Sequence, residues 1–316
     1  MSERLNVDPK FDVLGDILET LRFRGSIFFH SELAAPWGIS LPATEIPRFH
    51  IALSGDCFVG ISSDDAVKVE ETDIVMLPKG HSHWIADQPG RQLVSGEQVG
   101  KACELGAPLF QRGEITNRLM CGLVHYDQEA SHPIVDSLPE VLHFPQLKPT
   151  EPIWITVTLI DTEVLRTHHN RSPIVDRLTE VLFLQLLNRF VEGRDDAAGF
   201  FAALRDRRVH RALTLIHRQP GFDWSLSSLS EQVGMSRATL IRHFQDEVGM
   251  APMTYIANWR MMKAYNLIKH TADSLDRIAE SVGFISARTL SKAFQRHYGC
   301  TPSELRRLQY EVSEPE

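Results

Sequence analysis

Apolar residues recur at helical spacing in two neighbouring segments of the last third of the chain. They are Leu226, Leu229 and Val233 in the first segment, and Leu240, Phe244 and Val248 in the second. Spacings of three and four place such side chains on one face of a helix. Gly234 suits the left-handed conformation that ends a helix, and Ser236 suits the capping position that begins the next. The pattern predicts a helix-turn-helix.

The same pattern occurs again fifty residues later. SRATLIRHFQDEVGMAP at 236–252 aligns with SARTLSKAFQRHYGCTP at 286–302, and Gly283 takes the place of Gly234. A two-fold repeat of this length indicates a duplicated unit, because a solenoid normally needs at least three repeats. We therefore expect Ser286 to cap a second helix that buries Leu290 and Phe294.

A third helix is predicted between the two copies, over Pro252–Lys269. It opens with proline, which the first turn tolerates, and continues with Tyr255, Ile256, Trp259, Met262 and Leu267 near helical spacing. At about 1.5 Å per residue it forms a rod of roughly 27 Å. Such a rod holds two helices near the ~34 Å spacing of major-groove faces on one side of a duplex. A plain core helix is the alternative.

The outward faces of the two capped helices carry residues suited to DNA. These are Ser236, Arg237, Ala238, Ile241, Arg242 and Gln245 in the first helix, and Ser286, Ala287, Arg288, Ser291 and Lys292 in the second. Guanidinium groups reach guanine edges or phosphates, small apolar groups meet thymine methyls, and helix N-termini favour phosphate. An ordinary solvated face is the alternative for any single residue.

Charge is divided unevenly along the 316 residues. The whole chain carries −8, but residues 1–205 hold 18 basic and 29 acidic residues, whereas 206–310 hold 15 and 9. An acidic part therefore precedes a basic part, and the basic part contains the repeat. Such asymmetry points to nucleic acid.

Residues from about Asp206 to Leu308 resemble the DNA-binding domain of the AraC/XylS family of bacterial transcription regulators. The segments SLSSLSEQVGMSRATLIRHFQDEVGMAPMTYIANWRMMKA and RIAESVGFISARTLSKAFQRHYGCTPSELRR carry the resemblance. It implies promoter DNA as partner and contact with RNA polymerase. A role as an activator is expected, with repression as the alternative. Leu305 departs from the family, which usually has a tyrosine there.

The N-terminal half is predicted to be a small antiparallel β-barrel, so the fold class is α+β. Apolar runs flank a glycine turn in RFHIALSGDCFVGI at 48–61, and residues 67–85 read as strand, turn, strand. Further short apolar runs occur in QLVSGEQVG at 92–100 and in RLMCGLVHYD at 118–127. Many short strands between Gly, Pro and Asp are typical of such barrels.

DIVMLPKGHSHWIAD resembles the second cupin motif, in which Pro78, Gly80 and His83 bracket a hairpin. The region 11–190 is thus similar to the cupin-type sensor domain of one branch of AraC-like regulators. Thr72 and Asp87 depart from the motif.

The resemblance to cupins raises a metal ion as a candidate cofactor. Catalytic cupins supply paired histidines and a glutamate from their first motif, but this chain has only His50 there. His81 and His83 are candidate ligands with it, and His125, Cys57 and Cys121 are additional ones, because imidazole and thiolate suit zinc or copper. Histidines satisfied by backbone are the alternative.

Cys57 and Cys121 are candidate sites for an oxidant or electrophile, since a thiolate is the group that such species attack. Buried packing is the alternative for both. Only four cysteines occur in the chain, without CxxC spacing, so structural disulfides are not expected.

SPIVDRLTEVLFLQLLNRFVE at 172–192 predicts a capped helix with more apolar surface than one core needs. We expect it to support a homodimer, or else to pack on the chain's own barrel. The sequence therefore divides into a sensor domain at 1–192, a linker at 193–206 and a DNA-binding domain at 207–310.

The sequence as a whole indicates a DNA-binding transcription regulator, not an enzyme, whose N-terminal half senses a small molecule or reactive species. A cupin metalloenzyme with a DNA-binding appendage is one alternative, and a DNA-binding scaffold whose barrel only dimerises is another. No apolar run approaches the roughly 20 residues of a membrane span, and the N-terminus lacks a signal-peptide core. A cytoplasmic location is expected.

Overall fold

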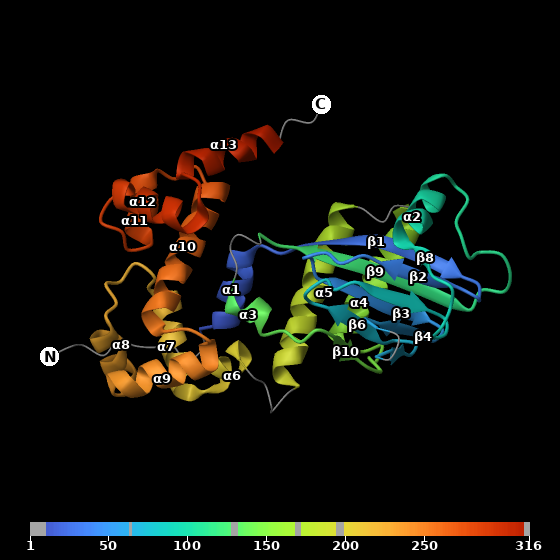
Figure 1. Ribbon diagram of the computed structural model, residues 1–316, viewed down its shortest axis with the longest axis horizontal. Coiled ribbons are helices and arrows are strands. Elements are labelled where there is room, and N and C mark those ends of the chain that lie inside the picture. Colours follow the sequence, from blue (N-terminus) through green and yellow to red (C-terminus); the bar gives the residue numbers. More distant parts are fainter. Residues whose placement is uncertain (1–10, 63–64, 128–131, 168–171, 194–198, 313–316) are drawn as a thin grey trace. The chain divides into compact units, whose positions relative to one another are not determined.

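The computed structural model describes residues 11–62, 65–127, 132–167, 172–193 and 199–312. The chain forms two compact units (Figure 1), and each is described by itself. The sheet unit comprises the described residues of Phe23–Tyr126 and Leu138–Gly193. The helical unit comprises the described residues before Phe23, those from Asp127 to Ser137, and those after Gly193.

The sheet unit contains two five-stranded sheets. One has the order β1 (Arg24–Leu33), β9 (Asn117–His125), β3 (Arg48–Ser54), β6 (Ile74–Leu77) and β10 (Leu142–Phe144). The other has the order β5 (Val67–Val69), β4 (Cys57–Gly60), β7 (His83–Ala86), β2 (Gly38–Leu41) and β8 (Val94–Ser95). All neighbours are antiparallel except β2 and β8. The predicted cupin-like, mainly antiparallel fold is confirmed, although the strands form two sheets and not one closed barrel.

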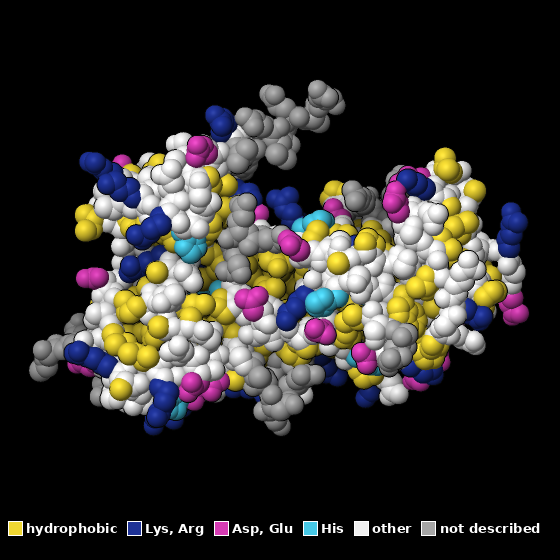
Figure 2. Space-filling model, viewed as in Figure 1, with side chains coloured by type: hydrophobic (Ala, Val, Ile, Leu, Met, Phe, Trp, Pro, Cys, Tyr) yellow, Lys and Arg dark blue, Asp and Glu magenta, His cyan; other side chains and the backbone are white. Residues whose placement is uncertain are grey.

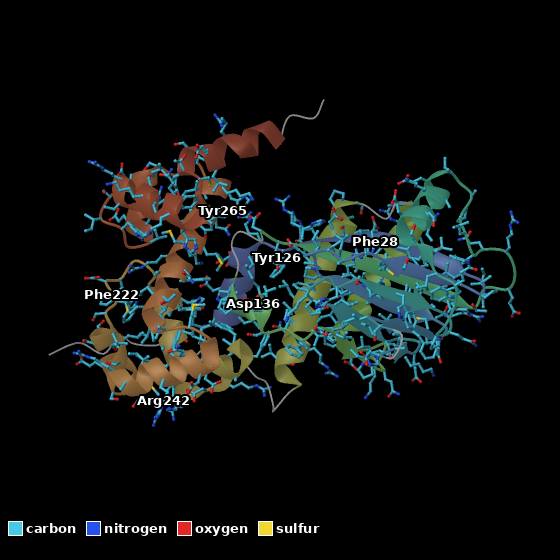
Figure 3. All side chains as sticks on the ribbon, in the orientation of Figure 1. Phe28, Tyr126, Asp136, Phe222, Arg242 and Tyr265 are labelled. Atoms are coloured by element: carbon cyan, nitrogen blue, oxygen red, sulfur yellow. The ribbon has the colours of Figure 1, made fainter. Side chains whose placement is uncertain are left out.

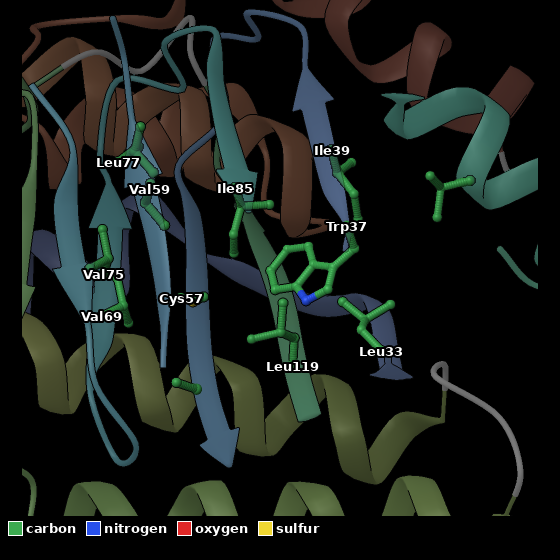
Figure 4. Packing of buried hydrophobic residues seen from close by; sticks show 12 residues of the cluster. Leu33, Trp37, Ile39, Cys57, Val59, Val69, Val75, Leu77, Ile85 and Leu119 are labelled. Atoms are coloured by element: carbon green, nitrogen blue, oxygen red, sulfur yellow. The ribbon is translucent and has the colours of Figure 1, made fainter. Parts of the chain in front are cut away.

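Apolar side chains from both sheets form a common core (Figure 4). Trp37 is its largest member, and its indole Nε1–H donates to Oδ1 of Asn117 at 3.0 Å. The amide of Asn117 in turn donates to the carbonyl oxygen of Asp56 at 2.8 Å. The one polar atom of the buried indole is thus satisfied, as burial of tryptophan requires.

The hairpin predicted around Pro78, Gly80 and His83 is wrong. β6 and β7 belong to different sheets, so the chain crosses between sheets there. Gly80 has φ +62°, and a Cβ atom on it would stand 2.1 Å from the carbonyl oxygen of Thr44. Glycine is therefore needed for a close backbone approach at this crossing and not for a hairpin turn.

Three helices accompany the sheets: α2 (Gly96–Glu104), α4 (Pro152–Thr167) and α5 (Pro173–Glu192). α4 packs on α5, and α5 packs against β1 and β9. Ser172 caps α5 as predicted, because its side chain accepts the Val175 N–H at 3.1 Å and proline follows it. The apolar run at 92–100 contributes only the two residues of β8, because Ser95 starts α2 with a capping box.

The helical unit contains both predicted helix-turn-helices. They are α8 (Leu226–Val233) with α9 (Arg237–Val248), and α11 (Leu275–Ser281) with α12 (Ala287–Tyr298). α10 (Pro252–His270) joins them, so all three predictions of the sequence are confirmed. The unit also contains α1 (Val13–Leu21), α3 (Pro133–Asp136), α6 (Phe200–Arg205), α7 (Arg207–Arg218) and α13 (Pro302–Val312).

Two short helices from the N-terminal half of the sequence pack on helices of the C-terminal part. α1 contacts α7 and α10, and α3 contacts α6. In the predicted linker at 193–206, residues 194–198 lie outside the described residues, and α6 occupies 200–205. The compact units therefore do not follow the linear order of the predicted segments.

Each helix-turn-helix is held to α10 by an aromatic pair. Phe244 of α9 lies edge-on to Tyr255, with ring centroids 5.6 Å apart. Its repeat equivalent, Phe294 of α12, stacks on Tyr265 at 6.3 Å. Pairs of this kind contribute about 0.5–1.5 kcal/mol beyond area burial. Within the part of the chain that the structure describes, no helix combines the length and apolarity that a membrane span requires.

Candidate nucleic-acid interface

α9 and α12 are matched in length and in their capping. Each has 12 residues, begins after a serine and ends at a left-handed glycine, Gly249 or Gly299. The Ser236 hydroxyl oxygen accepts the Thr239 N–H at 3.2 Å, and the Ser286 hydroxyl oxygen accepts the Thr289 N–H at 3.3 Å. Each serine satisfies one of the four free N–H groups at its helix start. The duplicated sequence thus produces duplicated local structure.

Most of the residues predicted to contact DNA lie on the outside of these helices. Figure 3 shows Arg242 at the outer edge of α9, and Figure 2 shows Lys and Arg side chains on the surface of the helical unit. The exposed residues are Ser236, Arg237, Ala238, Arg242, Gln245, Arg288 and Lys292, and the half-buried ones are Ile241, Ser286, Ala287 and Ser291. The Ser291 hydroxyl donates to the carbonyl oxygen of Ala287 at 2.8 Å, within its own helix.

The cations on these faces have no acidic partner among the residues that the structure describes. Within the described residues, none of Arg237, Arg242, Arg288 and Lys292 takes part in an ion pair, in contrast to the bidentate pair of Arg166 with Glu163 on α4. Their charge is therefore available to phosphates or base edges.

The two helices differ in charge. α9 carries Arg237 and Arg242 but also Asp246 and Glu247, whereas α12 carries three cations and no carboxylate. The third cation, Arg296, is exposed and was not among the predicted residues. Its spacing of four from Lys292, which itself follows Arg288 by four, is the signal that identifies it. α12 is therefore the more basic of the two helices.

Behind these helices a chain of buried polar groups crosses the helical unit. Nε2 of His132 and Nε2 of His217 lie 2.9 Å and 2.7 Å from the phenolic oxygen of Tyr255. Nδ1 of His217 lies 2.8 Å from Oδ2 of Asp16, whose other oxygen accepts from Nζ of Lys263 at 2.6 Å. The chain thereby joins α1, the start of α3, α7 and α10.

Hydrogen-bond chemistry assigns every proton in this chain. The backbone N–H of Ile134 donates to Nδ1 of His132 at 3.1 Å, so His132 is neutral and donates from Nε2 to Tyr255. The tyrosine hydroxyl must then donate to Nε2 of His217, which donates from Nδ1 to Asp16. Burial lowers the pKa of both histidines, which agrees with neutral rings.

A second buried chain lies in the sheet unit and contains the predicted metal ligands His50 and His83. Nδ1 of His83 donates to the carbonyl oxygen of His81 at 2.7 Å, so its Nε2 must accept from Nε2 of His50 at 2.8 Å. Nδ1 of His50 then accepts from the Cys121 thiol at 2.9 Å. Burial lowers the pKa of His83 to about 4 and that of His50 well below its usual range.

The contacts of His50 and His83 use the ring nitrogens that a metal ion would need, whereas Nε2 of His81 has no hydrogen-bond partner among the described residues. Cys121 and His83 are bound to opposite sides of the His50 ring, and Nε2 of His81 lies 4.0 Å from Oε1 of Glu140. The described residues contain no group of three or more His, Cys, Asp or Glu side chains that could hold a metal ion. The residues present therefore do not fit a resident metal, and we derive no chemistry from one.

Both cysteines predicted to meet an oxidant are buried thiols. Cys57 belongs to the core cluster between the sheets, where burial raises its pKa to about 12. Burial also raises the pKa of Cys121, and the hydrogen bond to His50 uses its proton. Reactive cysteines are accessible and have a lowered pKa, so neither site has the properties of a reactive thiolate.

Comparisons with known proteins agree with the two-part architecture. A sequence profile described as cupin matches residues 12–192, and one described as a helix-turn-helix domain matches residues 229–308. An uncharacterized HTH-type transcriptional regulator of Haemophilus influenzae is 29% identical over 305 residues, covering 94% of this chain and 98% of its own length. An AraC-like transcription regulator of Streptomyces antibioticus is 27% identical over 299 residues, with the same coverage of both chains.

The chain is an AraC-type transcriptional regulator with an N-terminal cupin domain. A solved transcriptional regulator from Chromobacterium violaceum, described as AraC-type, is 26% identical and covers 36% of this chain and 99% of its own, with a TM-score of 0.32. Relatives that match the present chain over nearly its full length are named as transcription regulators. The present chain therefore acts as a regulator and not as an enzyme. The alternative of a cupin metalloenzyme is set aside.

Proposed function

We propose that this AraC-type regulator binds promoter DNA through the outer faces of α9 and α12, in successive major-groove segments of one duplex. The observation that carries the proposal is the pair of serine-capped helices whose exposed cations have no acidic partner among the described residues. Arg242 and Arg288 are assigned to base edges or phosphates, and the serine-capped helix starts approach phosphates.

The cupin unit is assigned the sensing of a small molecule. An effector shifts the regulator between states only by its differential affinity for them. α1 directly precedes β1 in the sequence, and α3 lies between β9 and β10, yet α1 contacts α7 and α10 and α3 contacts α6. These two helices offer a covalent route for such a shift. Contact with RNA polymerase, activation of transcription and a cytoplasmic location complete the proposal.

A homodimer formed through α4 and α5 is also part of this proposal. α5 buries Leu182, Phe183, Leu186 and four further residues, yet Ile174 and Val181 remain 53% and 42% exposed. On α4, Ile155, Leu159 and Leu165 are similarly exposed. Apolar side chains gathered on two packed helices favour a partner surface.

Binding of the full chain to duplex DNA tests the proposal. Selection from a random duplex library should enrich sequences with two short elements about one helical turn apart. Recovery of no preferred sequence would overturn it. Light scattering of the same preparation should give about twice 35.8 kDa, and a mass that stays at 35.8 kDa at high concentration would remove the dimer.

A further inference from the structure

The long helix α10 is not the only connection between the two helix-turn-helices. The loop of residues 219–225, which joins α7 to α8 of the first, touches the turn of the second between α11 and α12. A Cβ atom on Gly283 would stand 2.9 Å from the carbonyl oxygen of Gly221, and one on Gly221 would stand 2.9 Å from that of Ser281. The two backbones therefore meet where both positions lack a side chain.

Arg260 lies at the same place and binds this loop. Its Nε donates to the carbonyl oxygen of Pro220 at 2.7 Å, and a terminal nitrogen donates to that of Phe222 at 2.6 Å. The same terminal nitrogen is 2.9 Å from the Cβ position of Gly283. The Arg260 guanidinium thus lies against both helix-turn-helices. Its planar arrangement of N–H donors fixes the direction of both hydrogen bonds.

The repeat itself shows that this contact belongs to the second copy alone. Gly234 and Gly283 occupy equivalent turns and have similar left-handed backbones, with φ of +71° and +79°. Around Gly234 none of the described residues lies within 4 Å of the Cβ position, whereas Gly283 meets Gly221 and Arg260. The left-handed backbone accounts for a glycine in both turns. Close packing against the other helix-turn-helix, however, is present only at Gly283.

We infer that Gly221, Arg260 and Gly283 form a second joint that fixes the separation and angle at which α9 and α12 read DNA. The inference deepens the proposed function and rests on it. A single helix permits bending and twist between its ends, but a second contact away from its axis restricts both. One added base pair moves a groove segment by about 3.4 Å and turns it by roughly 35°, so a fixed angle selects one separation.

Three alanine variants of the full chain test the joint. Gly283→Ala and Gly221→Ala place a methyl group inside it, and Gly234→Ala is the matched control in open space. Gly221→Ala carries no left-handed strain, since the φ of Gly221 lies outside that region. If Gly283→Ala fails to fold, Gly221→Ala alone still tests the joint.

The probe is the duplex selected by the wild-type chain, together with duplexes in which the two elements are one base pair closer or farther apart. Fluorescence anisotropy should show that wild type and Gly234→Ala prefer the selected separation. In Gly221→Ala and Gly283→Ala, affinity for that duplex should fall about tenfold, the size expected from overpacking, and affinity for the altered separations should change little. Arg260→Lys, which keeps the charge but loses the fork, should give an intermediate loss of preference.

The outcomes separate this inference from the proposed function. If the wild type selects two elements and both joint variants keep its preference among separations, the inference is overturned. An equal loss of affinity on all three duplexes would also overturn it, because that result means damage to the reading helices themselves. If the wild type selects no two-element sequence, the proposed function fails first.

Discussion

Nε2 of His217 lies 2.7 Å from the phenolic oxygen of Tyr255, and this hydrogen bond is the middle link of a fully assigned buried chain. One end of the chain is the backbone N–H of Ile134, and the other is the carboxylate of Asp16. Because each group donates in one direction only, no member can change its protonation without breaking a bond.

Tyr255→Phe should therefore destabilise the helical unit. It removes the hydroxyl and leaves a donor on His132 and an acceptor on His217 buried without their partner. Such a loss costs about 1–3 kcal/mol. Urea denaturation followed by circular dichroism measures it. Thr254→Ala, which removes an exposed hydroxyl from the same helix, is the comparison, and an equal effect of both substitutions would contradict the role of the chain.

Stability should also fall with pH below about 6.5, the ordinary pKa of histidine. Burial lowers the pKa of His132 and His217 in the folded protein, although the hydrogen bond to Asp16 raises that of His217. The groups facing them are Asp16, Lys263, His210 and Tyr255. Because the folded state binds fewer protons than the unfolded one, stability is full above this pH and declines as pH decreases.

Asp16 adds to the same trend at lower pH. Burial raises its pKa, but hydrogen bonds from His217 and Lys263 outweigh this and lower it below its usual value. Its contribution is lost only as pH falls through the acidic range. Denaturation at pH 7.5, 6.0 and 5.0 tests both effects. A His132→Gln/His217→Gln variant should show a weaker dependence, and a dependence equal to that of the wild type would contradict the role of these two histidines.

The sequence predicted the features that depend on neighbouring residues. Ser172, Ser236 and Ser286 cap helices because each hydroxyl oxygen accepts the free backbone N–H three residues later, an interaction that depends only on neighbouring residues. Phe244 and Phe294 are core residues because helical spacing alone places them on the buried face. Because the helix-turn-helix is duplicated, the same cap and core positions could be recognised in both copies of the repeat.

Features that depend on distant residues were not predictable. His50 meets Cys121 across 71 positions, and β6 is separated from β7 only because each finds its partners in a different sheet. The contact of Asp16 with His217 spans 201 positions. A short apolar pattern shows that one face of a helix is buried, but not which other element buries it. The packing of α1 against the C-terminal helices therefore could not be predicted from its sequence.

Thiol labelling should distinguish the exposed cysteine Cys103 from the two buried ones, Cys57 and Cys121. Cys103 is exposed and should react with a thiol reagent in the folded protein, although partial burial and the charge of Glu104 raise its pKa. Cys57 and Cys121 are buried, and burial raises the pKa of both. They should react only after unfolding, because the thiolate is the attacking species. Mass spectrometry after peptide digestion measures each site. Rapid native labelling of Cys121 would show that the buried chain with His50 opens readily.

Removal of the central arginine from either reading helix should weaken DNA binding. Arg242→Ala and Arg288→Ala should each cost about 1–3 kcal/mol on the selected duplex if the side chain reads a base. Lys101→Ala is the control, since that exposed cation lies on α2 and pairs with Glu97. Anisotropy titration measures the affinities, and unchanged binding by both variants would remove these two residues from the interface.

The charge difference between α9 and α12 predicts a difference in salt dependence. Each phosphate contact contributes about 0.9 to the slope of log affinity against log salt concentration. Lys292→Ala and Arg296→Ala on α12 should each reduce this slope by about 1, with nearly equal loss of affinity on preferred and random duplexes. Gln245→Ala on α9 removes no charge, so it should leave the slope unchanged even where it lowers affinity for the preferred sequence. Titrations at several salt concentrations decide the matter, and a slope insensitive to both α12 substitutions would mean that the cations of this helix do not lie against the phosphate backbone.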